Sequence, residues 1–187
     1  MFIHRHLENV DSTQALARSK YQELRPNQLV LYSASWQNAG FGQFGRKWIS
    51  PKNNIYTTYC FLLDAKYTDR IDSITQLVSA QVLHLLAFYH LQGAIKFPND
   101  VLINGKKICG ILCQSLHNSF TDKVGAKYHA VLIGIGINVN ASADQLQQVD
   151  QACTSMQLET GLNYDIQEVT NRLSKFIMHI MQDLQKA

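Results

Sequence analysis

No stretch of this chain is apolar for long enough to suggest a membrane span. The longest candidate, residues 71–91, is interrupted by Asp72, Gln81 and His84, whereas a span needs about 20 predominantly apolar residues. The first twelve residues, MFIHRHLENVDS, also lack the apolar core of a signal peptide. Neither export nor membrane insertion is therefore expected.

Strong charge of one sign is also missing. The 187 residues carry a formal net charge of +3 without a concentrated Lys/Arg run, so composition does not predict nucleic-acid binding. The four cysteines are too scattered for a disulfide framework or a zinc knuckle, and reduced thiols fit a cytoplasmic protein. An apolar fraction of 46% excludes a disordered chain and fits one globular domain.

The segment KFPNDVLINGKKICGIL, residues 96–112, is predicted to contain a β-hairpin. Asn104-Gly105 is a dipeptide that readily adopts the positive φ angles of a tight hairpin turn. The apolar runs on either side, 101–103 and 108–112, are therefore predicted to pair as antiparallel strands.

A bend is expected just before this hairpin, because Pro98 cannot lie in a central strand. The bend and the hairpin bring Asn99, Asp100 and Lys107 into one small region. An amide, a carboxylate and an ammonium group suit an anionic ligand with a metal ion. The alternative is an ordinary hairpin with solvated charges.

The rest of the chain has the periodicities of an α/β protein. We expect strands over 2–8, 29–35, 54–63 and 128–139, helices over 12–24 and 71–91 and from 165 onwards, a polar loop over 115–127, and a short helix with a loop over 144–161. The run VLIGIGIN is apolar enough to be buried on both faces of a sheet. Gly134 and Gly136 weaken a strand, so either a ligand or a packed helix approaches the backbone there.

The start of the first helix, DSTQ at 11–14, allows two interpretations. Asp11 or Ser12 can cap free backbone N–H groups. The same N–H groups and the helix dipole also favour an anionic ligand. Capping alone is the simpler interpretation.

The segment GFGQFGRKW, residues 40–48, has the glycine spacing of a dinucleotide-binding fingerprint. That fingerprint requires a helix directly after the glycines, whereas Pro51 and an extended run follow here. The segment is therefore predicted as a flexible loop whose backbone can approach phosphate or carboxylate closely. Arg46 and Lys47 add positive charge to it. A surface loop without a ligand is the alternative.

Taken together, these motifs resemble the biotin protein ligase family. The matching segments are DSTQ at 11–14, QNAGFGQFGRKW at 37–48, SPKNNIY at 50–56, KFPND at 96–100, KKICGIL at 106–112 and GIGIN at 134–138. The resemblance implies an α/β (α+β) fold, a mixed central β-sheet flanked by helices, related to class II aminoacyl-tRNA synthetase cores. It implies a single catalytic domain over 1–187, without an N-terminal DNA-binding domain and with the C-terminal barrel-like domain absent or vestigial.

The resemblance also implies an activity. Members of the family use ATP, with Mg²⁺, to activate biotin as biotinyl-5′-AMP, and transfer it to a lysine of a biotin carboxyl carrier protein, a subunit of acetyl-CoA carboxylase. Neither DNA nor a membrane is expected as a partner, and a homodimer is left open. A lipoate/octanoate-protein ligase of related fold and a non-catalytic biotin-binding module are the alternatives.

By motif position, the resemblance assigns a role to particular residues. Lys107 is the implied catalytic cation, because both reaction steps build negative charge on oxygen. The implied biotin-binding residues are Ser12, Thr13, Gln14, Gln37, Gly40, Phe41, Gly42, Gln43, Lys107, Gly110 and Gly134. The implied ATP and adenylate contacts are Arg46, Trp48, Asn99 and Asn138, and Asp100 is the candidate Mg²⁺ ligand.

The chain departs from the family pattern in its glycine-rich loop, which in the family usually reads GRGRxGR. Phe41, Gln43 and Phe44 occupy positions that are often arginine. Glutamine can hydrogen-bond but supplies no guanidinium charge. We therefore expect looser retention of the adenylate, or compensation by Lys47 or by a conformational change. Gln114 stands where glutamate is common.

Overall fold

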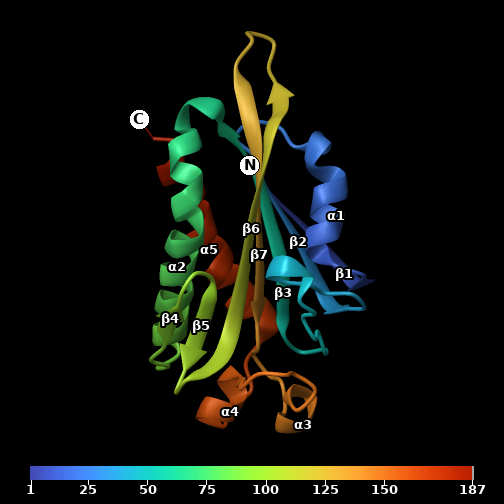
Figure 1. The fold of residues 1–187 in the computed structure, drawn as a ribbon, viewed down its shortest axis with the longest axis vertical. Helices are drawn as coiled ribbons and strands as arrows, with labels where there is room; N and C mark the ends of the chain where they lie inside the picture. Colours follow the sequence, from blue (N-terminus) through green and yellow to red (C-terminus); the bar gives the residue numbers. More distant parts are fainter. Residues whose placement is uncertain (187) are drawn as a thin grey trace.

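The computed structural model describes residues 1–186 (Figure 1). The elements follow the chain in the order β1 (Phe2–Val10), α1 (Thr13–Lys20), the 3₁₀ helix η1 (Tyr21–Glu23), β2 (Leu29–Gln37), η2 (Gln43–Gly45), β3 (Ile55–Asp64), η3 (Ala65–Ser73), α2 (Ile74–Phe88), β4 (Ala94–Lys96), β5 (Asp100–Ile103), β6 (Lys106–Thr121), β7 (Lys127–Ile137), α3 (Ala143–Leu146), α4 (Met156–Thr160) and α5 (Ile166–Leu184).

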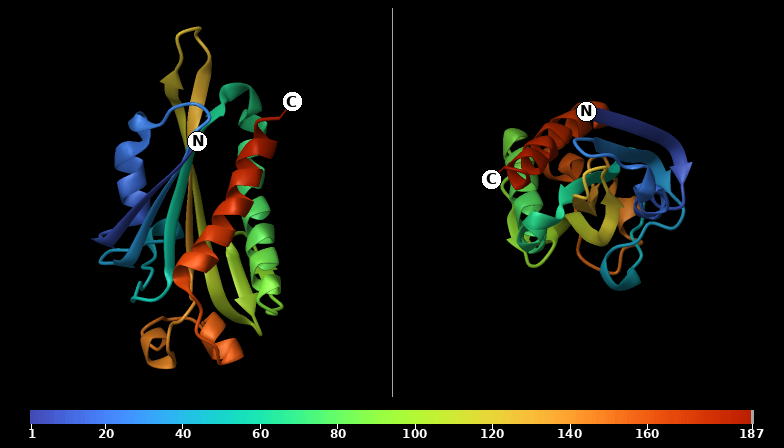
Figure 2. Two further views of the ribbon diagram at one scale, coloured as in Figure 1. Left: turned by 180° about the vertical axis from the view of Figure 1, so that it is seen from behind. Right: turned by 90° about the horizontal axis from the view of Figure 1, so that it is seen from above.

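Within these residues, seven strands form one sheet in the order β1-β2-β3-β7-β6-β5-β4. β1 and β2 are parallel, and the other neighbouring strands are antiparallel. The prediction of a mixed sheet flanked by helices is therefore confirmed. Figure 1 shows α1 on one side of the twisted sheet and α2 on the other, and the view from behind in Figure 2 shows α5 running alongside α2.

The sheet separates two hydrophobic cores, because successive residues of a strand face opposite sides. In β3, Tyr59 and Phe61 belong to the core formed with α2 and α5. Cys60 and Leu62 belong to the core that includes Ala17 of α1. Each of these side chains is almost completely buried. Burial on both faces explains why β3 and β7 are nearly continuous apolar runs.

The central hairpin forms as the sequence predicts. Asn104 and Gly105 have φ angles of 49° and 75°, the sign required at both central positions of a two-residue hairpin turn of this type. β5 and β6 pair on either side of them.

The prediction of a polar loop over 115–127 is wrong. β6 continues to Thr121 and β7 begins at Lys127, so that only residues 122–126 connect them. Pairing of β6 with β7 supplies backbone hydrogen bonds on both sides of a register shift between Leu116 and Phe120, although the sequence here is mostly polar. Figure 1 shows the resulting hairpin extending beyond the helices.

One helical stretch among residues 1–186, Ala65–Phe88, is long and apolar enough by length and composition to cross a membrane. The sequence had indicated that this region is too polar to span a membrane, and its length and composition do not support that prediction. Its packing is that of a core helix, because Val78, Val82 and Leu85 are completely buried in the core shared with the sheet and α5. The core of a water-soluble fold passes the same test of length and composition.

The four cysteines are free, as expected. Burial raises the pKa of Cys113 to about 11, and it raises the pKa of Cys60 and Cys109 as well. Thiols in such surroundings stay protonated and are poor nucleophiles.

A histidine pair at the base of the projecting hairpin makes stability depend on pH. The rings of His117 and His129 lie 4.7 Å apart, and burial, together with the charge of His117, lowers the pKa of His129. The pKa of His129 in the folded protein is therefore below its unfolded value of about 6.5. Its contribution to stability is present above the unfolded pKa and is lost as the pH falls from there through the folded pKa. We expect the melting temperature to drop between about pH 7.5 and pH 5.5, and to drop less in His129→Gln. An equal drop in both proteins would contradict this assignment.

Candidate active site

A pocket opens on the α1 face of the sheet, where large side chains give way to glycine. Leu132 of β7 is buried against α1, and the next residues on the same face are Gly134 and Gly136. Gly136 pairs directly with Gly110 of β6. The absence of side chains at these positions leaves a hollow of about 700 Å³, including its open mouth.

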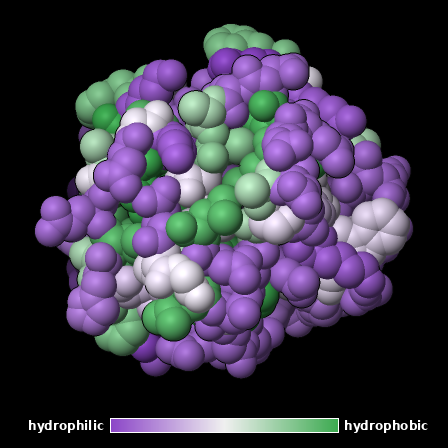
Figure 3. Space-filling view, turned by 90° about the horizontal axis from the view of Figure 1, so that it is seen from below, coloured by the Kyte–Doolittle hydropathy of each residue, from purple (hydrophilic) through white to green (hydrophobic). Residues whose placement is uncertain are grey.

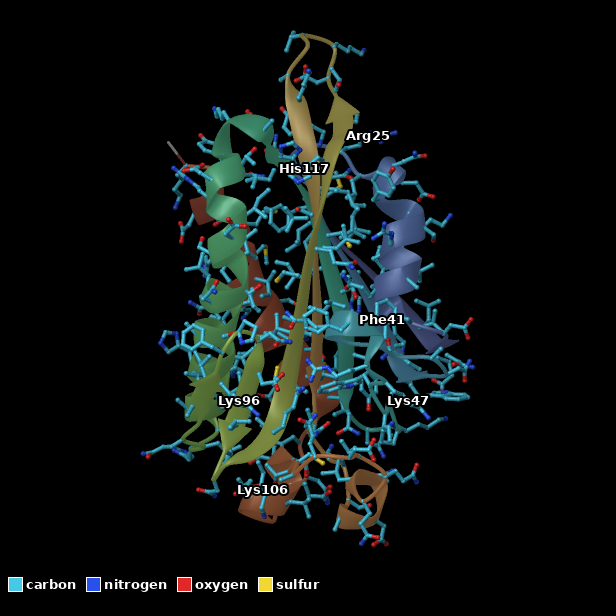
Figure 4. The ribbon with its side chains drawn as sticks, in the orientation of Figure 1. Arg25, Phe41, Lys47, Lys96, Lys106 and His117 are labelled. Carbon is cyan, nitrogen blue, oxygen red and sulfur yellow. The ribbon has the colours of Figure 1, made fainter. Side chains whose placement is uncertain are left out.

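The pocket brings together most of the residues that the sequence singles out. Ser12, Thr13, Gln14, Gln37, Phe41, Gly42, Gln43, Arg46, Trp48, Asn99, Asp100, Lys107, Gly110 and Gly134 all line it. They come from five separate segments of the chain. In Figure 4, Phe41 and Lys47 are labelled on the right of the view, and Lys96 and Lys106 are labelled on the left.

Two of the predicted residues do not line the pocket. Asn138 is buried and donates from Nδ2 to the carbonyl of Thr154, 2.9 Å away, so it ties the end of β7 to the loop that follows. Gly40 lies at the base of the glycine-rich loop, where a Cβ atom would come within 2.7 Å of Gln37 Nε2 and Ser50 Oγ. These positions have structural reasons for their residues, and their roles towards a ligand stay predictions.

Other pocket residues escaped the sequence analysis. Tyr56, Thr58 and Gln151 line the pocket as well. For Tyr56 and Thr58, the sequence offered one indication of a pocket, because both are polar residues within the otherwise apolar strand β3. Burial raises the pKa of Tyr56, and its protonated hydroxyl donates to the carbonyl of Pro51 at 2.7 Å.

An ion pair lies on the floor of the pocket. Lys107 Nζ is 2.7 Å from Asp100 Oδ1, and the two side chains are only 14% and 17% exposed. The backbone of Lys107 is held on a second side, because its N–H donates to Ala152 and its carbonyl accepts from Thr154, each at 2.9 Å. The ammonium group is therefore fixed in place and largely shielded from water, which strengthens its field in the pocket.

The indole of Trp48 covers the glycine floor. Cβ atoms built on Gly110 and Gly136 would both lie 2.6 Å from its ring, so the ring packs directly against the backbone of the paired strands. Lys107 Nζ lies 5.0 Å from the ring centroid, within range of a cation–π interaction. Trp48 Nε1 is buried and, within the described part of the chain, has no hydrogen-bond partner.

The loop over 40–48, which we call the lid loop, is ordered as a small hairpin. Gly42 N–H donates to the carbonyl of Arg46, and Trp48 N–H donates to that of Gly40, each at 2.8 Å. Phe41 and Gln43 line the pocket, whereas Phe44 is 93% exposed. The lid loop therefore presents uncharged side chains to the pocket at two of the three positions where it departs from the family pattern.

The end of the molecule below the pocket mixes apolar and polar surface. Figure 3 looks onto this end and shows apolar atoms near the centre, surrounded by hydrophilic residues. Phe97, on the bend before β5, is 70% exposed.

A model of the biotin/lipoate A/B protein ligase family matches residues 7–138. The chain belongs to this family. It is 34% identical over 173 residues to a biotin–[acetyl-CoA-carboxylase] ligase of Paracoccus denitrificans, covering 90% of this chain and 68% of that protein. It is 32% identical over 158 residues to the bifunctional ligase/repressor BirA of Bacillus spizizenii, covering 83% of this chain but only 46% of that protein. The chain thus spans about half the length of the second relative.

Among solved structures, this family member resembles a biotin protein ligase from Aquifex aeolicus in complex with biotin and ATP. The TM-score is 0.73 at 24% identity, covering 98% of this chain and 72% of that chain. At that identity the likeness establishes the fold. The predicted class II synthetase-like architecture, with a mixed sheet between helices, is confirmed.

Proposed function

We propose that this chain is a biotin protein ligase that works as one catalytic domain. In the first step a carboxylate oxygen of biotin bonds to the α-phosphorus of ATP, and the bond from that phosphorus to pyrophosphate breaks. In the second step a carrier lysine nitrogen bonds to the acyl carbon, the bond to AMP breaks, and the nitrogen loses a proton. Membership of the family and the 34% identity to a named biotin ligase support this activity.

The observation that carries the proposal is the shielded Lys107 at the centre of the predicted motif residues. Negative charge grows on oxygen at phosphorus in the first step and at the acyl carbon in the second. A cation fixed beforehand in a water-poor pocket stabilises both charges without reorganisation. Lys107 would supply that cation, and its ion pair with Asp100 holds the ammonium group in place until substrates arrive.

The inner wall of the pocket favours biotin over a linear acyl chain. Where the pocket meets α1, it is lined by Thr13, Gln14 and Thr58, all almost completely buried. A ureido group can hydrogen-bond to such a wall, whereas lipoate or octanoate would leave these polar groups without partners at a cost in affinity. These groups support the proposal that the ureido ring of biotin binds at this wall.

The opposite part of the pocket suits the nucleotide. Trp48 offers an aromatic face and Arg46 a guanidinium group at the mouth. Among residues 1–186, no group of three or more His, Cys, Asp or Glu side chains could hold a metal ion by itself. Mg²⁺ that arrives with ATP needs only one or two carboxylates besides phosphate oxygens, and Asp100 fits that role. Bound Mg²⁺ would supply charge neutralisation of the phosphates.

The test is biotin-dependent AMP formation from ATP and Mg²⁺, with and without a biotin carboxyl carrier domain. Carrier-dependent turnover supports the ligase. Adenylate that is made but not transferred would limit the proposal to the first step. AMP with lipoate but not with biotin would assign the chain to the lipoate branch, and AMP with neither would favour a non-catalytic binding module.

The uncharged side chains of Phe41 and Gln43 in the lid loop lead to a prediction about adenylate release. Gln43→Arg places a guanidinium group at a position that lines the pocket. One added charged hydrogen bond to the adenylate should slow its release about tenfold or more. The measurement is the rate at which labelled adenylate leaves the enzyme after excess unlabelled biotin is added.

Phe44→Arg is the matched control, because it adds the same charge to the same loop on an exposed side chain. Its release rate should stay near that of the wild type. A release rate in Gln43→Arg that is unchanged or faster would contradict the interpretation of the loop.

A further inference from the structure

A row of hydrogen-bonded side chains runs through the inner wall of the pocket and ends on the strand β6. Thr58 Oγ1 lies 3.0 Å from Thr13 Oγ1 and 3.2 Å from Gln14 Oε1. Gln14 Nε2 donates to Gln114 Oε1 at 3.0 Å. At the other end, the hydroxyl and the backbone N–H of Thr13 both donate to Gln37 Oε1.

One end of this row has a fixed direction. A backbone N–H can only donate, so Gln37 must turn its oxygen towards Thr13. Its Nε2 group then donates to Ser50 Oγ at 2.9 Å. The Thr13 hydroxyl in turn must direct its proton to Gln37.

The other end has no such fixed direction. Thr58 carries one hydroxyl proton and can give it either to Thr13 or to Gln14. The amides of Gln14 and Gln114 have nearly the same shape after exchange of oxygen and nitrogen, and among the described residues Gln114 has no other side-chain partner than Gln14. Two arrangements of these amides and hydroxyl protons are therefore possible.

The two arrangements present opposite polarity to a ligand. In the first, Gln14 Nε2 donates to Gln114, and Gln14 turns its oxygen towards Thr58 and Gly134, where a Cβ atom would lie 2.6 Å from that oxygen. The Thr58 hydroxyl directs its one proton towards Thr13 and Gln14, so each of their oxygens keeps one acceptor position for a ligand. In the second, both amides are reversed, Gln14 presents N–H groups instead, and Thr58 donates to Thr13.

We propose that Gln114 is a positioning residue that acts through Gln14 to set whether the inner wall accepts or donates hydrogen bonds. A cyclic urea carries two N–H donors beside its carbonyl acceptor, and in this proposal an N–H edge faces Gln14 and Thr13, which both offer acceptor oxygens in the first arrangement. This inference rests on the proposed binding of biotin and adds a residue that does not line the pocket and reaches the ligand only through Gln14.

Gln114→Glu and Gln114→Lys separate the two arrangements. A carboxylate only accepts, so glutamate holds the first arrangement, and an ammonium only donates, so lysine imposes the second. We expect lysine to weaken biotin binding about tenfold through the loss of a buried hydrogen bond. Glutamate should bind biotin at least as tightly as the wild-type glutamine, because it removes the population of the second arrangement.

The measurement is titration calorimetry with biotin, repeated with ATP alone and at high salt, which screens a general effect of charge. ATP affinity should be the same in all variants. Ser115→Lys is the matched control, because it adds the same charge at the next residue, on the other face of β6. Gln114→Met, which neither donates nor accepts strongly, should bind biotin more weakly than Gln114→Glu, and it provides the comparison if the lysine variant does not fold.

Glutamate and lysine variants that bind biotin equally would overturn the positioning role, since a packing role would not distinguish donor from acceptor. A weakening in Ser115→Lys equal to that in Gln114→Lys would also overturn it. Wild-type protein that gives no heat with biotin, yet remains folded, would instead overturn the proposed function itself.

Discussion

Replacing Lys107 with alanine is expected to slow biotin-dependent AMP formation by at least about a hundredfold, because one preorganised charge donor at a reacting oxygen contributes on that scale. The site offers little to replace it. Arg46 and Lys47 also line the pocket, but both are exposed at its mouth. The variant also leaves Asp100 as a shielded carboxylate without its cation. That carboxylate would then repel the phosphates of ATP.

Lys106→Ala is the matched control, because it removes the adjacent lysine, which does not line the pocket and is exposed beyond its edge (Figure 4). Its rate should stay close to that of the wild type. AMP formation and the melting temperature are measured for both variants. An active Lys107→Ala enzyme, with folding intact, would remove the main argument for the proposed mechanism.

The sequence predicted the local structure around the pocket well where local chemistry decides it. The Asn104-Gly105 turn requires positive φ angles, and the structure has them. That turn, together with a register shift between Val101 and Leu102 that the sequence did not predict, brings Lys107 next to Asp100. Glycine at 134 and 136 indicated a close approach to the backbone, and a close approach is what the structure contains.

The sequence could not identify what makes that close approach. Gln14 lies over Gly134 and Trp48 over Gly136, contacts between segments that are far apart in the chain. Periodicity describes one segment at a time, so it carries no information on such pairs. For the same reason the bonds from Thr58 to Thr13 and Gln14 had no signal beyond two threonines in an apolar strand.

The error over 115–127 has a related cause. Polar, partly exposed residues favour a loop when each residue is considered alone. Here the two strands of a long hairpin pair at Thr121↔Lys127 and Phe120↔Tyr128 and again from Leu116↔Ala130 inwards, with a register shift between Leu116 and Phe120. Pairing with a distant strand thus outweighs local composition.

Gly136→Ala is expected to lower the rate of adenylate formation about ten- to a hundredfold, because a displacement of 1 Å in a catalytic pocket can have an effect of that size. A Cβ atom at this position would lie 2.6 Å from the Trp48 ring, whereas ordinary contact begins at 3.4 Å. The ring must therefore leave the floor. Its backbone cannot follow, since its N–H and carbonyl are held by Gly40 and Ser50, so the side chain must rotate and uncover Lys107.

The fluorescence of Trp48, read in a Trp36→Phe background, should change together with the rate. Gly125→Ala is the control, because its φ of 86° makes any side chain strained, yet it lies at the turn of the distant hairpin. It should lower the melting temperature and leave the rate unchanged, whereas Gly136→Ala should do mainly the reverse. A wild-type rate in Gly136→Ala would mean that the indole leaves the glycine floor during catalysis anyway, and that the floor matters only before substrates bind.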